Sequence, residues 1–335
     1  MCGSLKVMAA ACAAACVFAW VAAAIAAAAT DDPEIRAAEA WAFPVPNTPD
    51  PSAPELAHAP KPDAHEALHV AGSQRTYTRA QIDVFNPPDW FPQDHPPMPQ
   101  VVGHGRKPAF ACAYCHMPDG EPEPAGAAIA GLPEAYILEQ VAAFRSGERG
   151  TSQLPSIRAM AAEAHWVTDA DLQQAAAYFS KLRFVPRTRV VETETVPRTH
   201  WQDYVLMPDK HTAREPLGER IIEVPVNVRD YMNRDHRDGF IAYVPPGSIA
   251  RGAGIASKGN GAAQACESCH GADLQGAGMY PPLAGRSPTY IVRQLILFST
   301  GQRNNAEAVP MKLEVSQLSV GDMIDVAAYA ASRKP

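Results

Sequence analysis

The sequence lacks several features that would indicate a familiar function. It has no cluster of basic residues, no phosphate-binding glycine loop, no nucleotide motif and no recognisable Ser/His/Asp set. Its 29 Lys and Arg residues are scattered and are outnumbered by 36 Asp and Glu residues, so the formal net charge is −7. Such a surface gives no electrostatic footprint for a phosphate backbone. We therefore expect no nucleic-acid partner.

The N-terminal segment predicts export. Residues 1 to 29 carry one Lys near the start, then an uncharged apolar run, and end in small residues before "TDD", which is typical of a cleaved secretory signal peptide. The run from Val7 to Ala29 is also long enough to span a bilayer. An uncleaved N-terminal membrane anchor is therefore the alternative, and only then do we expect membrane contact. Both interpretations place the remaining chain outside the cytoplasm, and we expect a periplasmic protein.

Cysteine is scarce outside this segment. Of seven cysteines, three lie within the first 29 residues, and the other four form the pairs "CAYCH" at 112–116 and "CESCH" at 266–270. Each pair is followed directly by a histidine. Four free thiols are unusual in an oxidising compartment. We therefore expect these cysteines to be bonded to a cofactor or to another group.

The two motifs belong to an internal duplication. Residues from Cys112 onward align with those from Cys266 onward at a constant offset of 154, without a gap, for 38 positions. Beyond the motifs, the matched pairs include Tyr136/Tyr290, Gln140/Gln294, Phe144/Phe298, Gly147/Gly301 and Arg149/Arg303. Each copy should be one domain. Apolar residues recur with helical spacing in both copies, so the predicted order is CxxCH, loop, helix, loop, terminal helix, and the fold class is all-α.

The chain thus divides into five expected segments. They are a signal peptide (1–29), a Pro-rich extension (30–97), a first domain (98–184), a connecting segment (185–245) and a second domain (246–335). Fifteen prolines between residues 31 and 110 argue against an extension that is mostly helix or sheet. The β-branched alternation in "ERIIEVPVNV" predicts one short strand in an otherwise mostly irregular connection, which should wrap both domains because so long a loop is unlikely to lack structure.

Three interpretations of the CxxCH motifs compete. A redox dithiol is expected at a helix start after a βαβ pattern, and neither copy has strands before it. A four-cysteine zinc site would leave the histidines without a role. Covalent haem attachment uses every residue, because two thiols add to the vinyl groups and the histidine binds iron. We therefore expect two covalently bound haem c groups, one on Cys112 and Cys115 with His116, the other on Cys266 and Cys269 with His270.

The sixth iron ligand should come from far along the chain. Met160 and Met311 satisfy this, since they are the only methionines that coincide when the copies are superposed, here at an offset of 151. The alternative is that both fill the core. His165 is the rival ligand in the first domain, although the second copy has Ser316 there. Ligation by His and Met would raise both potentials relative to two histidines.

Arg149 and Arg303 are a further matched pair. A guanidinium suits a haem propionate, whereas the alternative is a solvated arginine at a helix end. The sequence alone does not separate these two possibilities.

With these residues in view, the chain resembles the class I c-type cytochromes, and specifically their two-domain, di-haem members. The resemblance is carried by "CESCHGADLQG", "PPLAGRSPTYIVRQLILFSTGQR", an isolated Met311 and "LSVGDMIDVAAYAAS", and by "CAYCHMPDG" through "VTDADLQQAAAYFSKL". It implies a small helical fold around each haem whose last helix crosses the first, the first helix of the second domain being residues 248 to 258. It also implies a one-electron carrier between redox protein partners, with no catalytic residues.

Two other functions remain open at this point. The chain could be an electron-accepting subunit of a periplasmic dehydrogenase or a peroxidase-like haem enzyme with one labile ligand. A structural protein with zinc on its Cys and His residues is the alternative from another class.

Overall fold

The structure, a computed structural model of the 335-residue chain, describes residues 32–44, 63–121, 123–150, 154–202, 204–209 and 213–335. The expected signal segment, residues 1 to 29, lies outside the described residues. Among the helices that are described, none is both long enough and apolar enough to cross a membrane.

The first copy is helical, as expected. Its elements are α4 (Gln100–Gly103), α5 (Cys112–His116), α6 (Glu134–Ser146), α7 (Pro155–Trp166) and α8 (Asp169–Ser180). Gly147 ends α6 with a left-handed φ of 76°, and the Thr168 hydroxyl caps α8 by accepting from the Asp171 N–H. Helix α6 packs against both α7 and α8, and the buried residues around it include Val141 and Phe179. Helix α7 occupies the stretch before the terminal helix where we expected a loop, so that part of the prediction was wrong.

The second copy repeats this order. Its elements are α10 (Ser248–Lys258), α11 (Glu267–His270), η2 (Ala272–Leu274), α12 (Pro288–Ser299), η3 (Ala306–Ala308), α13 (Val309–Val315) and α14 (Val320–Ser332). The first helix of this copy has the bounds that the resemblance implied, and it packs against the last helix, α14. Gly252 permits the close approach, because a Cβ there would collide with the Asp325 carbonyl.

The copies differ most in their first helix. In the first copy it is only the four-residue α4, whereas α10 has eleven residues. The prolines at 96, 97 and 99 explain the difference, because a proline disfavours helix in the residue before it and cannot donate within a helix. The short helix still packs on α8, so the crossing of first and last helices is kept in reduced form.

The connecting segment is more ordered than we expected. Its strands are β3 (Thr188–Glu192), β4 (Thr195–Pro197), β5 (Thr199–Gln202), β6 (Val205–Pro208), β7 (Arg214–Pro216), β8 (Ile222–Pro225) and β9 (Phe240–Val244), with α9 (Val228–Met232) before β9. The order in the largest sheet is β3-β9-β8, with β3 parallel and β8 antiparallel to β9. The expected strand in "ERIIEVPVNV" is present as β8, but the prediction of only one short strand was wrong. Four of these strands end at a proline and all of them are short. No stretch of the sequence here is therefore long enough to show a clear alternation of apolar and polar residues.

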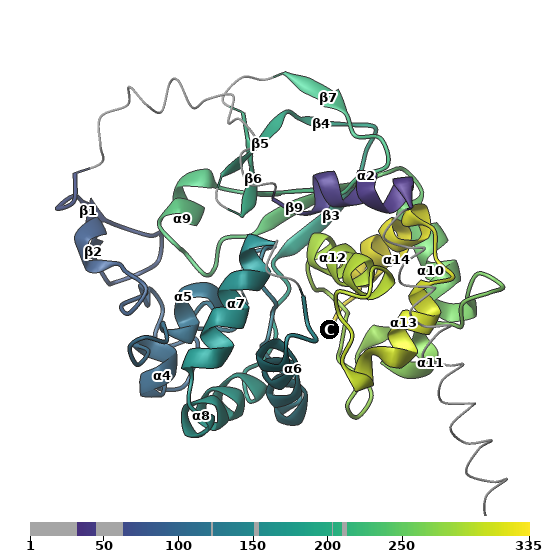
Figure 1. The fold of residues 1–335 in the computed structure, drawn as a ribbon. Coiled ribbons are helices and arrows are strands. Elements are labelled where there is room, and N and C mark those ends of the chain that lie inside the picture. Colours follow the sequence, from purple (N-terminus) through teal and green to yellow (C-terminus); the bar gives the residue numbers. More distant parts are fainter. Residues whose placement is uncertain (1–31, 45–62, 122, 151–153, 203, 210–212) are drawn as a thin grey trace, which may run out of the picture.

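The described part of the extension holds α2 (Pro33–Ala42), the strand pair β1 (Ala67–Leu68) and β2 (Tyr77–Thr78), and η1 (Arg79–Gln81). Helix α2 packs against α12 and α14, far away in sequence, as Figure 1 shows. The His95 ring lies edge-on to the Tyr178 ring of α8 in the first copy. The chain before the first motif therefore contacts both copies, while the residue limits of the five segments stay predictions.

Candidate haem-attachment sites

The first CxxCH motif forms the short helix α5. Cys112 is half-buried and Cys115 is exposed. The His116 ring places Nδ1 3.0 Å from the Ala127 carbonyl oxygen, and burial lowers the pKa of His116. A carbonyl only accepts, so a neutral His116 must donate from Nδ1. This tautomer leaves a lone pair on Nε2, the atom that a metal would take.

The second motif repeats this arrangement. His270 Nδ1 is 2.9 Å from the Pro281 carbonyl oxygen, and burial again lowers the pKa of the ring. Its Nε2 is buried and has no hydrogen-bond partner among the described residues. A buried nitrogen without a partner is uncommon and needs an explanation. Ala127 and Pro281 each stand eleven positions after their histidine, so the duplication has preserved a fixed ring with a free lone pair.

The thiols do not resemble those of a redox dithiol. Burial raises the pKa of Cys112 to about 12 and the pKa of Cys266 to about 11. Reactive cysteines and zinc ligands require the thiolate, which a low pKa favours. Within the described residues, no three His, Cys, Asp or Glu side chains form a group that could hold a metal ion. The geometry therefore does not assemble the two pairs into one zinc site.

The two candidate methionines occupy equivalent helices. Met160 lies on α7, half-buried against Val141 and Phe144, and Met311 lies on α13, half-buried against the second core. His165 is exposed, with Nδ1 2.8 Å from the Ala161 carbonyl of its own helix. These positions favour methionine over His165, but ligation by Met160 and Met311 stays a prediction.

A carboxylate ties each methionine helix to its motif. Glu163, three residues after Met160, accepts from the Phe110 N–H at 2.9 Å, two residues before Cys112. Glu314, three residues after Met311, accepts from the Gln264 N–H at 2.8 Å. The sequence analysis did not identify these two carboxylates. The signal was present, because Glu163 aligns with Glu314 at the same offset of 151 as the two methionines. The two methionine-bearing helices are thus held over their motifs in the same way.

Arg149 and Arg303 lie where the copies meet. The Arg149 guanidinium donates to the Tyr290 hydroxyl at 3.0 Å and the Gln294 amide oxygen at 3.2 Å. Arg303 reciprocates with Tyr136 at 2.8 Å and Gln140 at 2.6 Å. The two residues also pair as an isolated β-bridge. The matched residues of the duplication therefore contact one another across a pseudo-twofold axis.

These arginines are buried, and among the described residues no carboxylate hydrogen-bonds to either of them. They are 8% and 6% exposed, and the hydrogen-bond partners named above are neutral. Burial and the charge of Arg303 lower the pKa of Arg149. Two neighbouring buried cations are costly unless anions compensate them. The solvated alternative for these arginines is therefore wrong, and the site is chemically suited to haem carboxylates.

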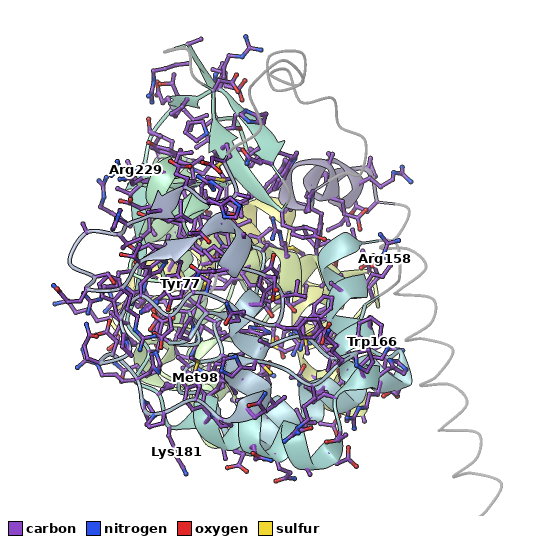
Figure 2. All side chains as sticks on the ribbon, turned by 90° about the vertical axis from the view of Figure 1, so that its left-hand side faces the viewer. Tyr77, Met98, Arg158, Trp166, Lys181 and Arg229 are labelled. Atoms are coloured by element: carbon purple, nitrogen blue, oxygen red, sulfur yellow. The ribbon has the colours of Figure 1, made fainter. Side chains whose placement is uncertain are left out.

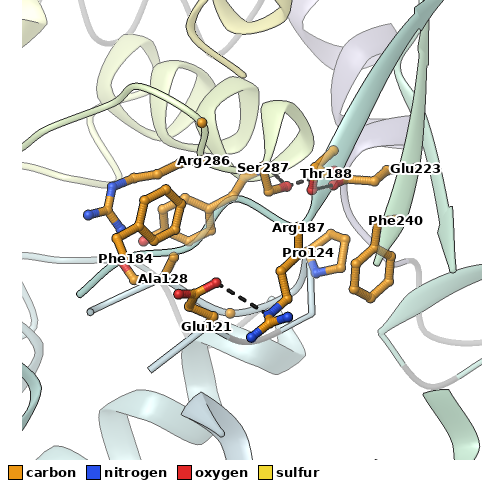
Figure 3. A pocket seen from close by; sticks show the side chains of 13 residues that line it. Glu121, Pro124, Ala128, Phe184, Arg187, Thr188, Glu223, Phe240, Arg286 and Ser287 are labelled. Carbon is orange, nitrogen blue, oxygen red and sulfur yellow. Dashed lines mark hydrogen bonds and ion pairs between the residues drawn. The ribbon is translucent and has the colours of Figure 1, made fainter. Parts of the chain in front are cut away.

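A small cavity of about 30 Å³ lies between the first copy, the β3-β9-β8 sheet and the second copy (Figure 3). Its walls include Glu121, Arg187, Glu223, Arg286 and Tyr290. Arg286 crosses the boundary and donates to the carbonyls of Ala128 and Ala130. A volume of about 30 Å³ admits only water molecules, so this cavity does not hold a cofactor.

Comparison with known proteins agrees with this chemistry. No family model matches the chain. Cytochrome c-554(548) of Halomonas halodenitrificans is 39% identical over 83 residues, which are 24% of this chain and 100% of that protein. Cytochrome c4 of Pseudomonas aeruginosa is 37% identical over 87 residues, 26% of this chain and 42% of that protein. The match thus spans less than half the length of this second relative.

Among solved structures, thiosulfate dehydrogenase from Marichromatium purpuratum has a TM-score of 0.48 and 25% identity, covering 70% of this chain and 39% of that one. This likeness carries no argument about function. Two duplicated helical units, each with a CxxCH motif and a fixed histidine, define a c-type haem protein. The chain belongs to the class I c-type cytochromes, as a di-haem member with two covalently bound haem c groups.

Proposed function

We propose that this protein is a periplasmic one-electron carrier between redox protein partners. Cys112 and Cys115 form thioethers with the first haem, and Cys266 and Cys269 with the second. The observation that carries the proposal is the repeated histidine geometry, in which each ring is fixed through Nδ1 and presents Nε2. His116 and His270 would then be the proximal iron ligands, and the buried Nε2 of His270 has no hydrogen-bond partner among the described residues.

Met160 and Met311 would fill the opposite axial positions. The support is their equivalence in the duplication and the tethers from Glu163 and Glu314, which hold both helices to the segments before the motifs. A thioether ligand favours the reduced iron more than a second imidazole does, so it raises the potential. Each haem supplies one reversible electron. If His and Met both bind each iron, no position would remain for a substrate, so we assign no catalytic residue.

The interface of the two copies would couple the haems. Arg149 and Arg303 are buried together with neutral partners, and the propionates of the two haems would provide the missing negative charge. Both propionate sets would then meet the same buried cationic pair. This arrangement fixes one haem relative to the other without requiring any motion.

Haem content and axial ligation test the proposal. Protein produced with a c-haem maturation system should carry two covalent haems per chain, and replacing Cys112 and Cys115 together by Ser should leave one. A colourless zinc protein would contradict the proposal. Co-purification with a catalytic chain would instead show a subunit of a dehydrogenase.

Methionine ligation has its own test. Met160→Ala should convert the first haem to a high-spin form that binds cyanide quickly, and Met311→Ala should do the same to the second. Met279→Ala is the matched control, because this methionine is 47% exposed and has no methionine counterpart in the first copy. If His165→Ala, and not Met160→Ala, produced the high-spin haem, His165 would be the ligand.

Export would be tested on the mature protein. A periplasmic fraction whose N-terminus begins at Thr30 would support a cleaved signal peptide. Recovery of full-length protein only from membranes would instead support the N-terminal anchor.

A further inference from the structure

Arg234 of the connecting segment lies against the first haem motif. Its guanidinium carbon is 4.3 Å from the centre of the Tyr114 ring, and its Nη2 donates to the Tyr114 carbonyl. The same nitrogen is 4.0 Å from the Met117 sulfur. One cation thus contacts one of the two residues between the cysteines and the residue that follows the histidine.

The surrounding structure fixes this position. Arg234 has a left-handed φ of 59°, which neighbouring contacts must maintain in a residue with a side chain. The preceding Asn233 accepts from the Trp90 indole N–H at 2.9 Å in a buried contact. Arg237 donates to both carboxylate oxygens of Asp94 at 2.6 Å. The extension therefore holds the Arg234 loop on both sides.

The charge of Arg234 reaches the attachment cysteine. Tyr114, which the Arg234 guanidinium contacts, is the residue directly before Cys115, so this charge lies beside the attachment site. The Arg234 Nε is buried and has no hydrogen-bond partner among the described residues.

The second motif has a different charge environment. Glu267 stands inside it, where the first motif has Ala113. Glu163 and Glu314 accept equivalent backbone hydrogen bonds just before the two motifs. The contrast therefore lies in Arg234 beside the first motif and Glu267 within the second.

We propose that Arg234 raises the reduction potential of the first haem above that of the second, so that a single electron rests on the first haem. The inference rests on the haem attachments proposed above. When an external one-electron donor reduces Fe(III) to Fe(II), no bond forms or breaks and the haem loses one unit of positive charge. A nearby fixed cation opposes the oxidised form, and a nearby anion favours it.

Spectroelectrochemistry of the holoprotein tests the proposal, after two haems per chain have been confirmed for each variant. Arg234→Gln should lower the higher of the two midpoint potentials by about 59 mV, a tenfold change in its reduction equilibrium, and leave the lower one unchanged. Arg234→Lys keeps the charge and should retain most of the difference even though it loses the planar contact with Tyr114. Glu267→Gln should raise the lower midpoint.

Arg229→Gln is the matched control. It removes the same charge from α9 of the same segment, but its side chain is 80% exposed and it lies at the surface in Figure 2. Neither midpoint should move in this variant. The proposal is overturned if Arg234→Gln shifts both midpoints equally, shifts only the lower one or shifts neither, or if Arg229→Gln has the same effect. A wild-type protein with fewer than two haems would instead contradict the proposed attachments.

Discussion

At the scale of single residues, the position after each proximal histidine is unusual. Gly271 follows His270 with φ 77° and ψ 166°, and Met117 follows His116 with φ 56° and ψ 159°. This region of the backbone map is nearly restricted to glycine. Met117 is therefore a strained residue. It is also buried, at 7% exposure, and in contact with Arg234, so packing by the connecting segment compensates where the second copy uses glycine.

This geometry predicts the cost of a side chain at the second position. Gly271→Ala should lower the free energy of unfolding by about 1–3 kcal/mol, because φ is positive and the new Cβ would lie 2.7 Å from the Gly276 carbonyl oxygen. Guanidinium titration followed in the Soret band measures the loss. Gly278→Ala is the control, since Gly278 has φ 60° and nothing within 4 Å of the added Cβ. Equal losses in the two variants would refute the role of the close contact.

At the scale of elements, the methionine helices depend on their carboxylate tethers. Helix α13 has only seven residues. An isolated helix of this length is not stable in water. The bond from the Gln264 N–H to Glu314 joins it to the segment before the second motif. A hydrogen bond to a charged group contributes about 1.5–3 kcal/mol, enough to decide whether such a helix stays in place.

We therefore expect Glu314→Ala to loosen α13 while the haem stays attached. Cyanide should bind the second haem faster, because the variant spends more time with the Met311 helix displaced, and the first haem should be unaffected. Stopped-flow absorbance measures both phases. Gln317→Ala is the control, because among the described residues this side chain bonds only to neighbouring Ser316. An unchanged cyanide rate in Glu314→Ala would show that α13 is held by its apolar contacts alone.

The elements also show what the sequence can predict. The period of apolar residues and the capping residues placed α6, α8, α12 and α14 correctly, because these features are local. The duplication then supplied candidate ligands. The connecting strands other than β8 were missed because β3 pairs with β9, about fifty residues away, and each strand is three to five residues long. The contacts of Arg234 could not be predicted either, because they arise only when the connecting segment folds back onto the first motif.

At the scale of the whole molecule, the duplication explains the interface. Tyr136, Gln140 and Arg149 match Tyr290, Gln294 and Arg303 in sequence, and in space each arginine meets the tyrosine and glutamine of the other copy. The alignment identified these residues but could not show that each arginine contacts the opposite copy. The connecting segment extends this arrangement, since Glu223 of β8 accepts from Thr188 at 2.8 Å and from Ser287 of the second copy at 2.6 Å.

Two carboxylates share one cation beside this interface. Arg187 is 2.8 Å from an Asp119 carboxylate oxygen and 3.4 Å from one of Glu121. Burial, and secondarily the charge of Asp119, raise the pKa of Glu121 to about 8, although Arg187 and Arg286 act in the opposite direction. At neutral pH the native protein therefore keeps Glu121 mostly protonated, with the Val185 N–H donating to its other oxygen.

This raised pKa sets the sign of a pH dependence. In the unfolded chain Glu121 loses its proton near its ordinary value of 4.5, whereas in the native protein it retains the proton up to about 8. The native state binds more protons in this window, so stability should fall as pH rises from about 5 to 8, by an amount on the order of a few kcal/mol.

Two variants test this pH dependence. Glu121→Gln keeps the shape of the side chain and an acceptor for the Val185 N–H, and it should flatten the unfolding free energy across the window. Asp119→Asn should leave a slope but move it to lower pH, because Arg187 would then pair with Glu121 alone. Denaturant titrations at each pH measure the three profiles, and a Glu121→Gln profile parallel to that of the wild type would assign the slope to other groups.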